Sequence, residues 1–180
     1  MSHNLPRRPR VRAAVFACLS IVLLAVDQST KIWAQQALAG GESIRIMPGL
    51  SLTLVRNPGA TLGLGSSRTW LISLVAILAC VGIVVLATRT DSLVWTIALA
   101  MGFAGALGNL IDRIVHATGF MDGKVVDFLD YGWSVGNVAD IALMGAGVLI
   151  VIMVVSGVPF TVSADADAGR GGGQGEDQGR

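Results

Sequence analysis

Apolar side chains are concentrated in four long runs, which short polar or turn-rich stretches separate. We place four membrane spans on these runs, at about 13–33, 70–88, 93–114 and 133–158. Each run is long enough to cross about 30 Å of hydrocarbon as an α-helix, which rises about 1.5 Å per residue. The pattern predicts an all-α membrane protein, a four-helix bundle, with residues 13–158 as its membrane domain.

A different pattern fills the stretch between the first two runs, where apolar and polar positions alternate. The alternating residues are Leu50, Ser51, Leu52, Thr53 and Leu54. Such alternation after the turn signal Pro48-Gly49 predicts a short strand pair that is half buried at the membrane surface. We therefore expect a small outward-facing β hairpin, or cradle, over about 42–67. A plain surface hairpin without a role in binding is the alternative.

The composition supports the membrane assignment and limits what else the chain contains. Hydrophobic residues make up 53% of the 180 residues, and charged residues only 14%, compared with about 25% in soluble domains. Little polar sequence remains for a separate soluble domain, and we expect the lipid bilayer, not a nucleic acid, as a partner. Cys18 and Cys80 lie inside apolar runs and suggest neither a disulfide framework nor a metal site.

Basic residues near the start of the chain predict its orientation. Residues 1–12 contain four arginines and no acid, which places this segment in the cytoplasm by the positive-inside rule. Four spans then return the Gly-rich segment 163–180 to the cytoplasm as a disordered tail. A cleaved signal peptide is a competing interpretation of the first run. It is disfavoured because Asp27 and Lys31 separate the run from the cleavage-like Ala37-Leu38-Ala39.

Acidic residues occur within or beside three of the spans at similar predicted depth. Asp27 lies about 22 Å along the first helix from Arg12, and Asp112 lies similarly far along the third. Asp140 lies about 10 Å below Trp133 on the fourth. We therefore expect one polar cluster near the outer leaflet. Structural ion pairs that lock the helices are the alternative to a chemical role.

Two aspartates suggest a specific chemistry. Asp127 is flanked by apolar residues that would hold its segment on the bundle, over Asp140. Two carboxylates close together in a poorly solvated site share a proton, so that one can activate a water and the other can polarise a carbonyl. This is the logic of aspartic proteases and needs no metal or cofactor. A metal held by Asp112, Asp127 and Asp140, or a proton-coupled transporter, are the rival interpretations.

Small residues recur at every fourth position of the third span, at Ala98, Gly102 and Ala106. Such a row lets helices approach closely. We favour packing within the same bundle, and hence a monomer. Homodimerisation, or recruitment of a partner by a non-catalytic bundle, is the alternative.

Several motifs occur in an order that resembles lipoprotein signal peptidase, or signal peptidase II. They are Asp27-Gln28-x-x-Lys31, Val55-x-Asn57-x-Gly59-Ala60, Gly105-Ala106-Leu107-Gly108-Asn109-Leu110-Ile111-Asp112-Arg113, Val125-Val126-Asp127-Phe128 and Asn137-Val138-Ala139-Asp140. The resemblance covers roughly 22–153. It implies a four-span aspartyl endopeptidase of the bacterial cytoplasmic membrane that cleaves diacylglyceryl-modified prolipoproteins just before the lipidated cysteine.

The resemblance also implies roles for individual residues. Asp127 and Asp140 would be the catalytic pair. Residues that position the substrate or support the pair would be Asn57, Gly59, Asn109, Arg113, Asn137 and Ala139. Residues that hold the helices together would be Asp27, Lys31 and Asp112. The sequence departs from the family pattern at Thr61-Leu62, where Ala-Phe is more usual, and at Gly136, where Phe is usual.

Overall fold

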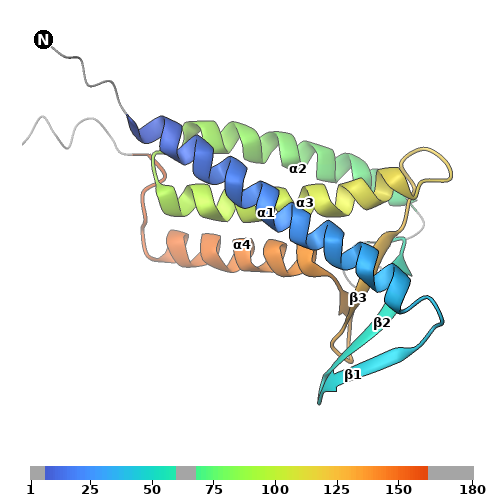
Figure 1. Cartoon of the computed structure of the whole chain (residues 1–180). Coiled ribbons are helices and arrows are strands. Elements are labelled where there is room, and N and C mark those ends of the chain that lie inside the picture. Colours follow the sequence, from blue (N-terminus) through green and yellow to red (C-terminus); the bar gives the residue numbers. More distant parts are fainter. Residues whose placement is uncertain (1–6, 60–67, 162–180) are drawn as a thin grey trace, which may run out of the picture.

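The computed structural model describes residues 7–59 and 68–161, which form four helices and four strands (Figure 1). In chain order these elements are α1 (Arg7–Ala37), β1 (Ser43–Met47), β2 (Leu50–Asn57), α2 (Thr69–Arg89), α3 (Leu93–Val115), β3 (Val125–Asp130), β4 (Val135–Gly136) and α4 (Val138–Val155).

All four helices are long and apolar enough to cross a membrane. Their outward surfaces carry large apolar side chains, such as Leu78 on α2 and Val151 on α4, which are 62% and 60% exposed. Water would penalise so much exposed apolar surface, whereas lipid does not. The predicted four-helix membrane bundle with a small β cradle is confirmed.

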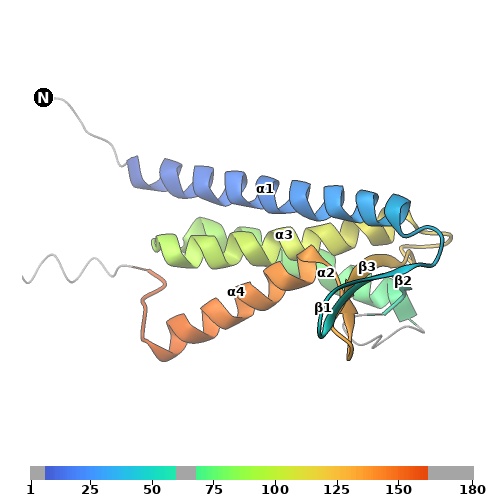
Figure 2. The same cartoon turned by 60° about the horizontal axis from the view of Figure 1, so that its bottom comes forward.

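Helix α3 is the central element and packs against each of the other three helices (Figure 2). Twelve of its residues are buried, compared with three in α2. Small side chains make this close packing feasible: a Cβ at Gly105 would lie only 2.5 Å from the carbonyl oxygen of Ala139 on α4. The row of Ala98, Gly102 and Ala106 is buried as well, so the single bundle already uses it for packing between helices.

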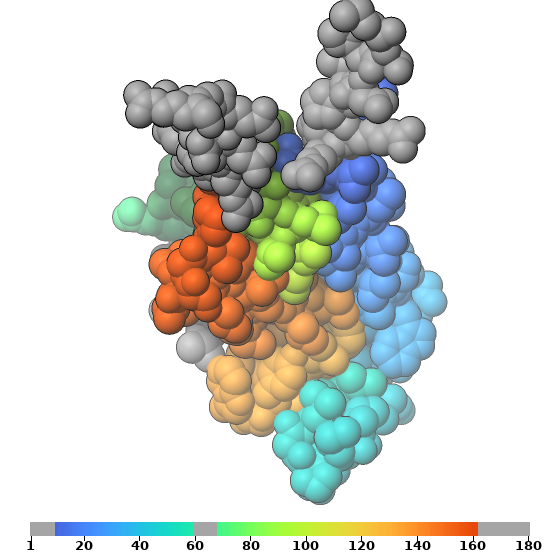
Figure 3. All heavy atoms as spheres, turned by 90° about the vertical axis from the view of Figure 1, so that its left-hand side faces the viewer, coloured from blue at the N-terminus to red at the C-terminus, as the bar shows by residue number. Residues whose placement is uncertain are grey.

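The four strands form one antiparallel sheet in the order β1-β2-β3-β4 at one end of the bundle. The β1–β2 hairpin turns at Pro48-Gly49, where Gly49 has a φ of +83°, a conformation that favours glycine. Strand β2 then pairs with β3, with Val55 opposite Asp127. The hairpin (cyan) projects sideways from the bundle when the molecule is viewed along the helices (Figure 3).

A small apolar core attaches the sheet to the end of α1. Phe128 of β3 is 3% exposed and packs with Ala34 and Leu38, and Leu52 and Leu54 of β2 cover this group. The apolar residues that follow Asp127 therefore do hold its segment against the bundle, as the sequence predicted.

The structure differs from the predicted elements at two places. Helix α4 begins at Val138 rather than at residue 133, because Asn137 is its N-cap and residues before it form strand β4. The segment that carries Asp127 is a strand, β3, which we did not predict, so the sheet is twice as large as the expected hairpin. Residues 60–67 of the expected cradle, Thr61-Leu62 included, and the expected tail at 163–180 lie outside the described residues.

The opposite end of the bundle is closed by contacts between the beginnings and ends of the helices. Arg12 of α1 forms an ion pair with Asp91 in the α2–α3 turn, at 2.9 Å. The ring of Trp95 packs edge-on against Phe160, with centroids 5.2 Å apart. The start of α1 and the segment after α4 therefore lie at the same end, away from the sheet (Figure 1).

Candidate active site

Three buried charged residues link α1 to α3 near the sheet. Lys31 lies 2.9 Å from Asp27 and 3.1 Å from Asp112, and all three are at most 2% exposed. A buried charge is tolerated only when it is paired and hydrogen bonded. We call these three residues the Lys31 cluster. The predicted convergence of acids from α1 and α3 is observed here.

Asp27 also caps helix α4. Its Oδ1 accepts a hydrogen bond from the backbone N–H of Ala139, at 2.9 Å. That N–H belongs to the first turn of α4, where no carbonyl within the helix is available to accept it and where a negative charge is favourable. Ala139 is 1% exposed and packs closely against α3, because Gly108 opposite it has no side chain: a Cβ at Gly108 would lie 2.6 Å from Oδ2 of Asp27 and 3.4 Å from Cβ of Ala139.

Asp112 fixes the strand that carries Asp127. Its Oδ2 accepts a hydrogen bond from the N–H of Val126, at 2.9 Å. Gln28 reinforces this arrangement, because its amide nitrogen donates to Asp27, Asp112 and the carbonyl of Gly108. We assigned no role to Gln28 from the sequence, although its place within the Asp27-Gln28-x-x-Lys31 motif was a signal.

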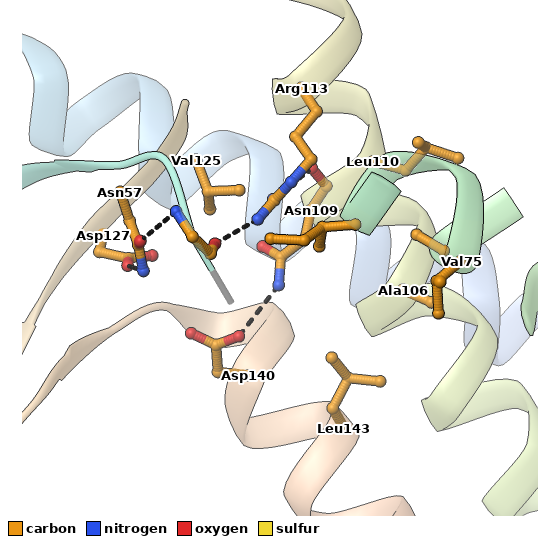
Figure 4. Close-up of a pocket in the computed structure, with 13 residues that line it drawn as sticks. Asn57, Val75, Ala106, Asn109, Leu110, Arg113, Val125, Asp127, Asp140 and Leu143 are labelled. Carbon is orange, nitrogen blue, oxygen red and sulfur yellow. Dashed lines mark hydrogen bonds between the residues drawn. The ribbon is translucent and has the colours of Figure 1, made fainter. Parts of the chain in front are cut away.

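The carboxylates of Asp127 and Asp140 line one cavity of about 200 Å³ (Figure 4). Asp127 is supplied by β3 and is 1% exposed, whereas Asp140 lies in the first turn of α4. Asn137 contacts both: its Nδ2 donates to Asp127 at 2.6 Å, and its backbone N–H donates to Asp140 at 3.2 Å. We call Asp127 and Asp140 the carboxylate pair. The structure brings them together, as the sequence predicted.

Three asparagine amides donate to the carboxylate pair. Asn57 donates to Asp127 at 2.8 Å, and Asn109 donates to Asp140 at 2.9 Å. In each asparagine the side-chain oxygen is held by a group that can only donate. The oxygen of Asn57 accepts from the N–H of Gly59, that of Asn109 from Lys31, and that of Asn137 from the N–H of Asp140. Their NH₂ groups must therefore face the carboxylates.

The hydrogen bonds between Asn137 and Asp140 form a capping box at the start of α4. The three-residue spacing of these two residues led us to place them on one helix face. The same spacing is also the sequence signature of a capping box, and it would have located the start of α4 correctly.

Arg113 closes the other side of the cavity. Its guanidinium donates to the carbonyl oxygens of Gly59 and Asn109, and the side chain is largely buried. Its Nε has no hydrogen-bond partner among the described residues. A buried donor without a partner costs free energy, which marks this nitrogen as a candidate to bind a substrate carbonyl.

The environment of Asp127 disfavours its charged form. Burial raises the pKa of Asp127 from its ordinary value of 3.8 to about 6, and repulsion from Asp140 acts in the same direction. Hydrogen bonds from Asn57 and Asn137, together with the charge of Lys31, oppose this rise only in part. A carboxyl group that titrates near neutral pH can both hold and release a proton.

Asp112 is not part of the carboxylate pair. One of its oxygens contacts Lys31 and Val126 and the other faces Gln28. The alternative of a metal held by Asp112, Asp127 and Asp140 is therefore not favoured. Within residues 7–59 and 68–161, no group of three His, Cys, Asp or Glu side chains is arranged to hold a metal ion.

Two hydroxyl groups on α2 that we did not predict attach the loops of the site. Thr69 donates to the carbonyl of Pro58, and Ser73 donates to the carbonyl of Met121, both at 2.7 Å. Pro58 follows Asn57, and Met121 precedes β3. Thr69 and Ser73 are four residues apart and share a helix face, but a hydroxyl in an apolar helix gives no sequence signal of its partner.

The amino-acid sequence of the chain matches a known family. The sequence profile of that family, described as Signal peptidase (SPase) II, matches residues 19–156. The chain belongs to the signal peptidase II family. It is therefore an aspartic peptidase and a multi-pass protein of the bacterial inner membrane, with four helices that can span it.

Relatives and solved structures agree with the family. A lipoprotein signal peptidase of Bifidobacterium adolescentis is 60% identical over 175 residues, covering 97% of this chain and 93% of that protein. One of Mycobacterium tuberculosis is 39% identical over 159 residues, covering 87% and 78%.

Two solved structures described as bacterial membrane enzymes, at 2.3 and 1.9 Å resolution, share the fold. The first has a TM-score of 0.68 and 26% identity, covering 91% of this chain and 95% of that one. The second has a TM-score of 0.64 and 28% identity, covering 78% and 92%.

Proposed function

We propose that this protein removes the signal peptide from diacylglyceryl-modified prolipoproteins, cutting just before the lipidated cysteine, with Asp127 and Asp140 as the catalytic pair. The observation that carries this proposal is the arrangement of the two carboxylates on one cavity, bridged by Asn137. Among the described residues, the buried acids gather at the sheet end of the bundle and do not form a row across it, which argues against a proton-coupled transporter.

The pair shares one proton, and each carboxyl has its own task. The ionised carboxylate takes a proton from a water, and the resulting hydroxide attacks the carbonyl carbon of the scissile peptide bond. The protonated carboxyl donates its proton to the carbonyl oxygen. When the tetrahedral intermediate collapses, the C–N bond breaks, the proton taken from the water passes to the leaving nitrogen, and the proton on the oxygen returns to the pair.

The neutral amides around the pair support this cycle by fixing its geometry. Asn57 and Asn109 hold one carboxylate each, and their amide groups do not ionise near neutral pH. Arg113 offers its free Nε to a substrate carbonyl, and Gly59 has its backbone aligned by the same guanidinium. These residues position the substrate backbone in the cavity, while the Lys31 cluster holds α1, α3 and α4 in register.

We also propose an orientation in the membrane. The arginines near the start of α1 place that end of the bundle in the cytoplasm, with both chain termini there and the carboxylate pair near the outer leaflet. Tryptophan positions support this placement. Trp33 lies in the last turns of α1, Trp70 in the first turn of α2 and Trp133 between β3 and β4, all at the sheet end, whereas Trp95 lies in the first turn of α3, at the other end. We further propose a monomer, since α3 uses its small residues inside the bundle.

The test is a cleavage assay in detergent with a synthetic precursor peptide, with or without diacylglycerol on its cysteine. We expect wild type to cut the lipidated peptide before the cysteine and the unlipidated peptide poorly, because acyl chains hold the peptide at the membrane surface. Asp127→Asn should lower the rate by roughly 10²–10⁴-fold. Asp91→Asn changes an acid at the opposite end of the bundle; it is the matched control and should cleave normally.

Two results would contradict the proposal. Cleavage by Asp127→Asn at the wild-type rate would remove Asp127 from the catalytic pair. Equal cleavage of the two peptides, or of neither, by the wild type would remove the lipidated precursor as the substrate.

A further inference from the structure

A cavity of about 300 Å³, separate from the candidate active site, lies between α1 and α2 at the end of the bundle opposite the sheet. Arg12 and Phe16 line it from α1, and Val84 and Ala87 line it from α2. The members of each pair are four or three positions apart, so they share one face of their helix. Val84 is 40% exposed, and the cavity is therefore reached from the side of the bundle that faces lipid.

The charge at this cavity comes from Arg12, whose guanidinium is only partly used within the protein. Its Nη1 lies 2.9 Å from both the backbone oxygen and Oδ1 of Asp91. Among the residues that the structure describes, its Nε and Nη2 have no hydrogen-bond partner. The side chain is 18% exposed, so these donors are partly withdrawn from water. The oxygens of a phosphate would accept from them, since the planar guanidinium matches phosphate geometry.

The charges that surround the opening are net positive. Arg10 on α1 and Arg89 in the last turn of α2 are exposed, and each lies two residues from a side chain that lines the cavity. Within residues 7–59 and 68–161, Asp91 is the one acidic residue at this end, and Arg12 already contacts it. An anionic group at the cavity would therefore meet Arg10 and Arg89 without a competing carboxylate.

Apolar side chains extend from the guanidinium towards the middle of the bundle. Phe16 lies one helical turn beyond Arg12, and its ring packs against Phe103 of α3, with centroids 5.4 Å apart. Val84 lies opposite on α2, nearer the bundle centre than Ala87. A free anion would use only the arginine. A molecule with an anionic head and a long alkyl chain would use both parts of the cavity.

We propose that this cavity binds an anionic phospholipid of the bilayer, with its phosphate on Arg12 and one acyl chain along Phe16 and Val84. Basic pockets between membrane helices on the cytoplasmic side bind such headgroups, and the orientation proposed above places the cavity on that side. The bound lipid joins α1 to α2. Helix α2 otherwise packs mainly against α3 and has only three buried residues, so the lipid stabilises its position. This inference does not depend on the cleavage reaction.

Native mass spectrometry of the full-length protein tests the site. The protein is released from detergent micelles that contain equal amounts of dioleoyl phosphatidylglycerol and dioleoyl phosphatidylcholine, which share acyl chains and differ in net charge. We expect the wild type to retain one phosphatidylglycerol in preference. Arg12→Gln should lower the ratio of retained phosphatidylglycerol to phosphatidylcholine by about fivefold. Arg68→Gln, which removes an exposed arginine at the sheet end, should keep the wild-type ratio.

A second variant tests the apolar part of the cavity and keeps the ion pair between Arg12 and Asp91. Val84→Trp fills the space for the acyl chain and should lower the same ratio by about fivefold or more. Val85→Trp is the matched control, because Val85 is 45% exposed and does not line the cavity. This arm decides the matter even if Arg12→Gln folds poorly.

Three results would overturn the proposal. Equal retention of the two lipids by the wild type, or retention of neither, would mean that no anionic lipid is selected. A wild-type ratio in Val84→Trp would place the bound lipid elsewhere on the bundle. Displacement of the phosphatidylglycerol by an equal concentration of glycerol 3-phosphate, which lacks acyl chains, would make the cavity a site for a soluble phosphate.

Discussion

Two groups of buried aspartates meet at the sheet end of the bundle, and they are held in different ways. In the Lys31 cluster, Asp27 and Asp112 both contact a lysine within 3.1 Å. In the carboxylate pair, Asp127 and Asp140 form no ion pair within 4 Å among the described residues, and neutral amides donate to them instead.

The comparison indicates a division of roles: the Lys31 cluster holds the helices together, and the carboxylate pair is left available for the proposed reaction. In the Lys31 cluster, each carboxylate is engaged by the lysine and by a backbone N–H of another element, so it serves to hold α1, α3, α4 and β3 together. Amide donors fix the position of a carboxylate and leave its protonation close to balance. Asn109 connects the groups, since it accepts from Lys31 and donates to Asp140. The Lys31 cluster thereby orients the carboxylate pair.

The largest expected effects are those of replacing one aspartate in the carboxylate pair and one in the Lys31 cluster. Asp140→Asn should lower cleavage by roughly 10²–10⁴-fold while keeping the melting temperature in detergent, because an amide oxygen can still accept from Asn109. Asp112→Asn should instead lower the melting temperature, because it leaves Lys31 with less compensating charge. Measuring both quantities on both variants tests the division of roles. Equal loss of stability in the two variants would contradict it.

Removing the lysine should have the next largest effect. Lys31→Met leaves two carboxylates buried without their cation, which should cost about 3–5 kcal/mol of stability. Adding Asp112→Asn removes one of those charges and should restore part of the loss, measured as melting temperature in detergent. If the double variant were less stable than Lys31→Met, the interpretation of the cluster as a charge-balanced unit would be wrong.

The pKa of Asp127 predicts a pH dependence of stability. Because its pKa in the folded protein is raised to about 6 from 3.8, the folded state favours the protonated form. The resulting stabilisation is complete below about pH 4 and is lost as the pH rises through about 6, by roughly 1–3 kcal/mol. Asp127→Asn lacks this titration. Its melting temperature relative to wild type should therefore rise between pH 4 and pH 6; a constant difference would contradict the raised pKa.

The smallest effect concerns the loop that carries Asn57. Thr69→Val removes the hydroxyl that donates to Pro58 and should cost about 0.5–1.5 kcal/mol, with a lower kcat and little change in KM. Thr69→Ser keeps the hydroxyl and should behave as wild type. Thr88→Val removes a hydroxyl that only bonds within α2 and controls for the substitution itself. Loss of kcat in Thr69→Ser as well would exclude the hydrogen bond as the cause.

Much of this architecture follows from local patterns in the sequence. Four apolar runs specify the helices, and the similar depths of Asp27 and Asp112 along α1 and α3 place these two acids together. The depth predicted for Asp140 assumed a helix from Trp133, which is wrong because α4 begins at Val138.

What local patterns do not contain is the pairing of distant segments. Val125 to Phe128 has three apolar residues and Asp127 and shows no regular alternation, so only its pairing with β2 reveals it as a strand. The hydrogen bond from Ala139 to Asp27 joins residues 112 positions apart and is fixed by helix packing.

The start of α4 shows a different limit. An apolar run does not reveal where a helix begins. Because Trp133 is apolar, we placed the start of the fourth span there, five residues before α4 begins at Val138. The helix in fact begins after Asn137, the N-cap residue, whose side chain forms the capping box with Asp140.

The double role of Asn137 has a consequence for how the protein is made. Its side chain starts the last helix and, through the other end of the same amide, holds Asp127. The carboxylate pair is therefore complete only after the final hydrophobic segment has left the insertion machinery and folded against the first three. A partly synthesised chain therefore lacks the complete carboxylate pair, and under the proposed function it would not cleave nearby lipidated polypeptides until biosynthesis is nearly finished.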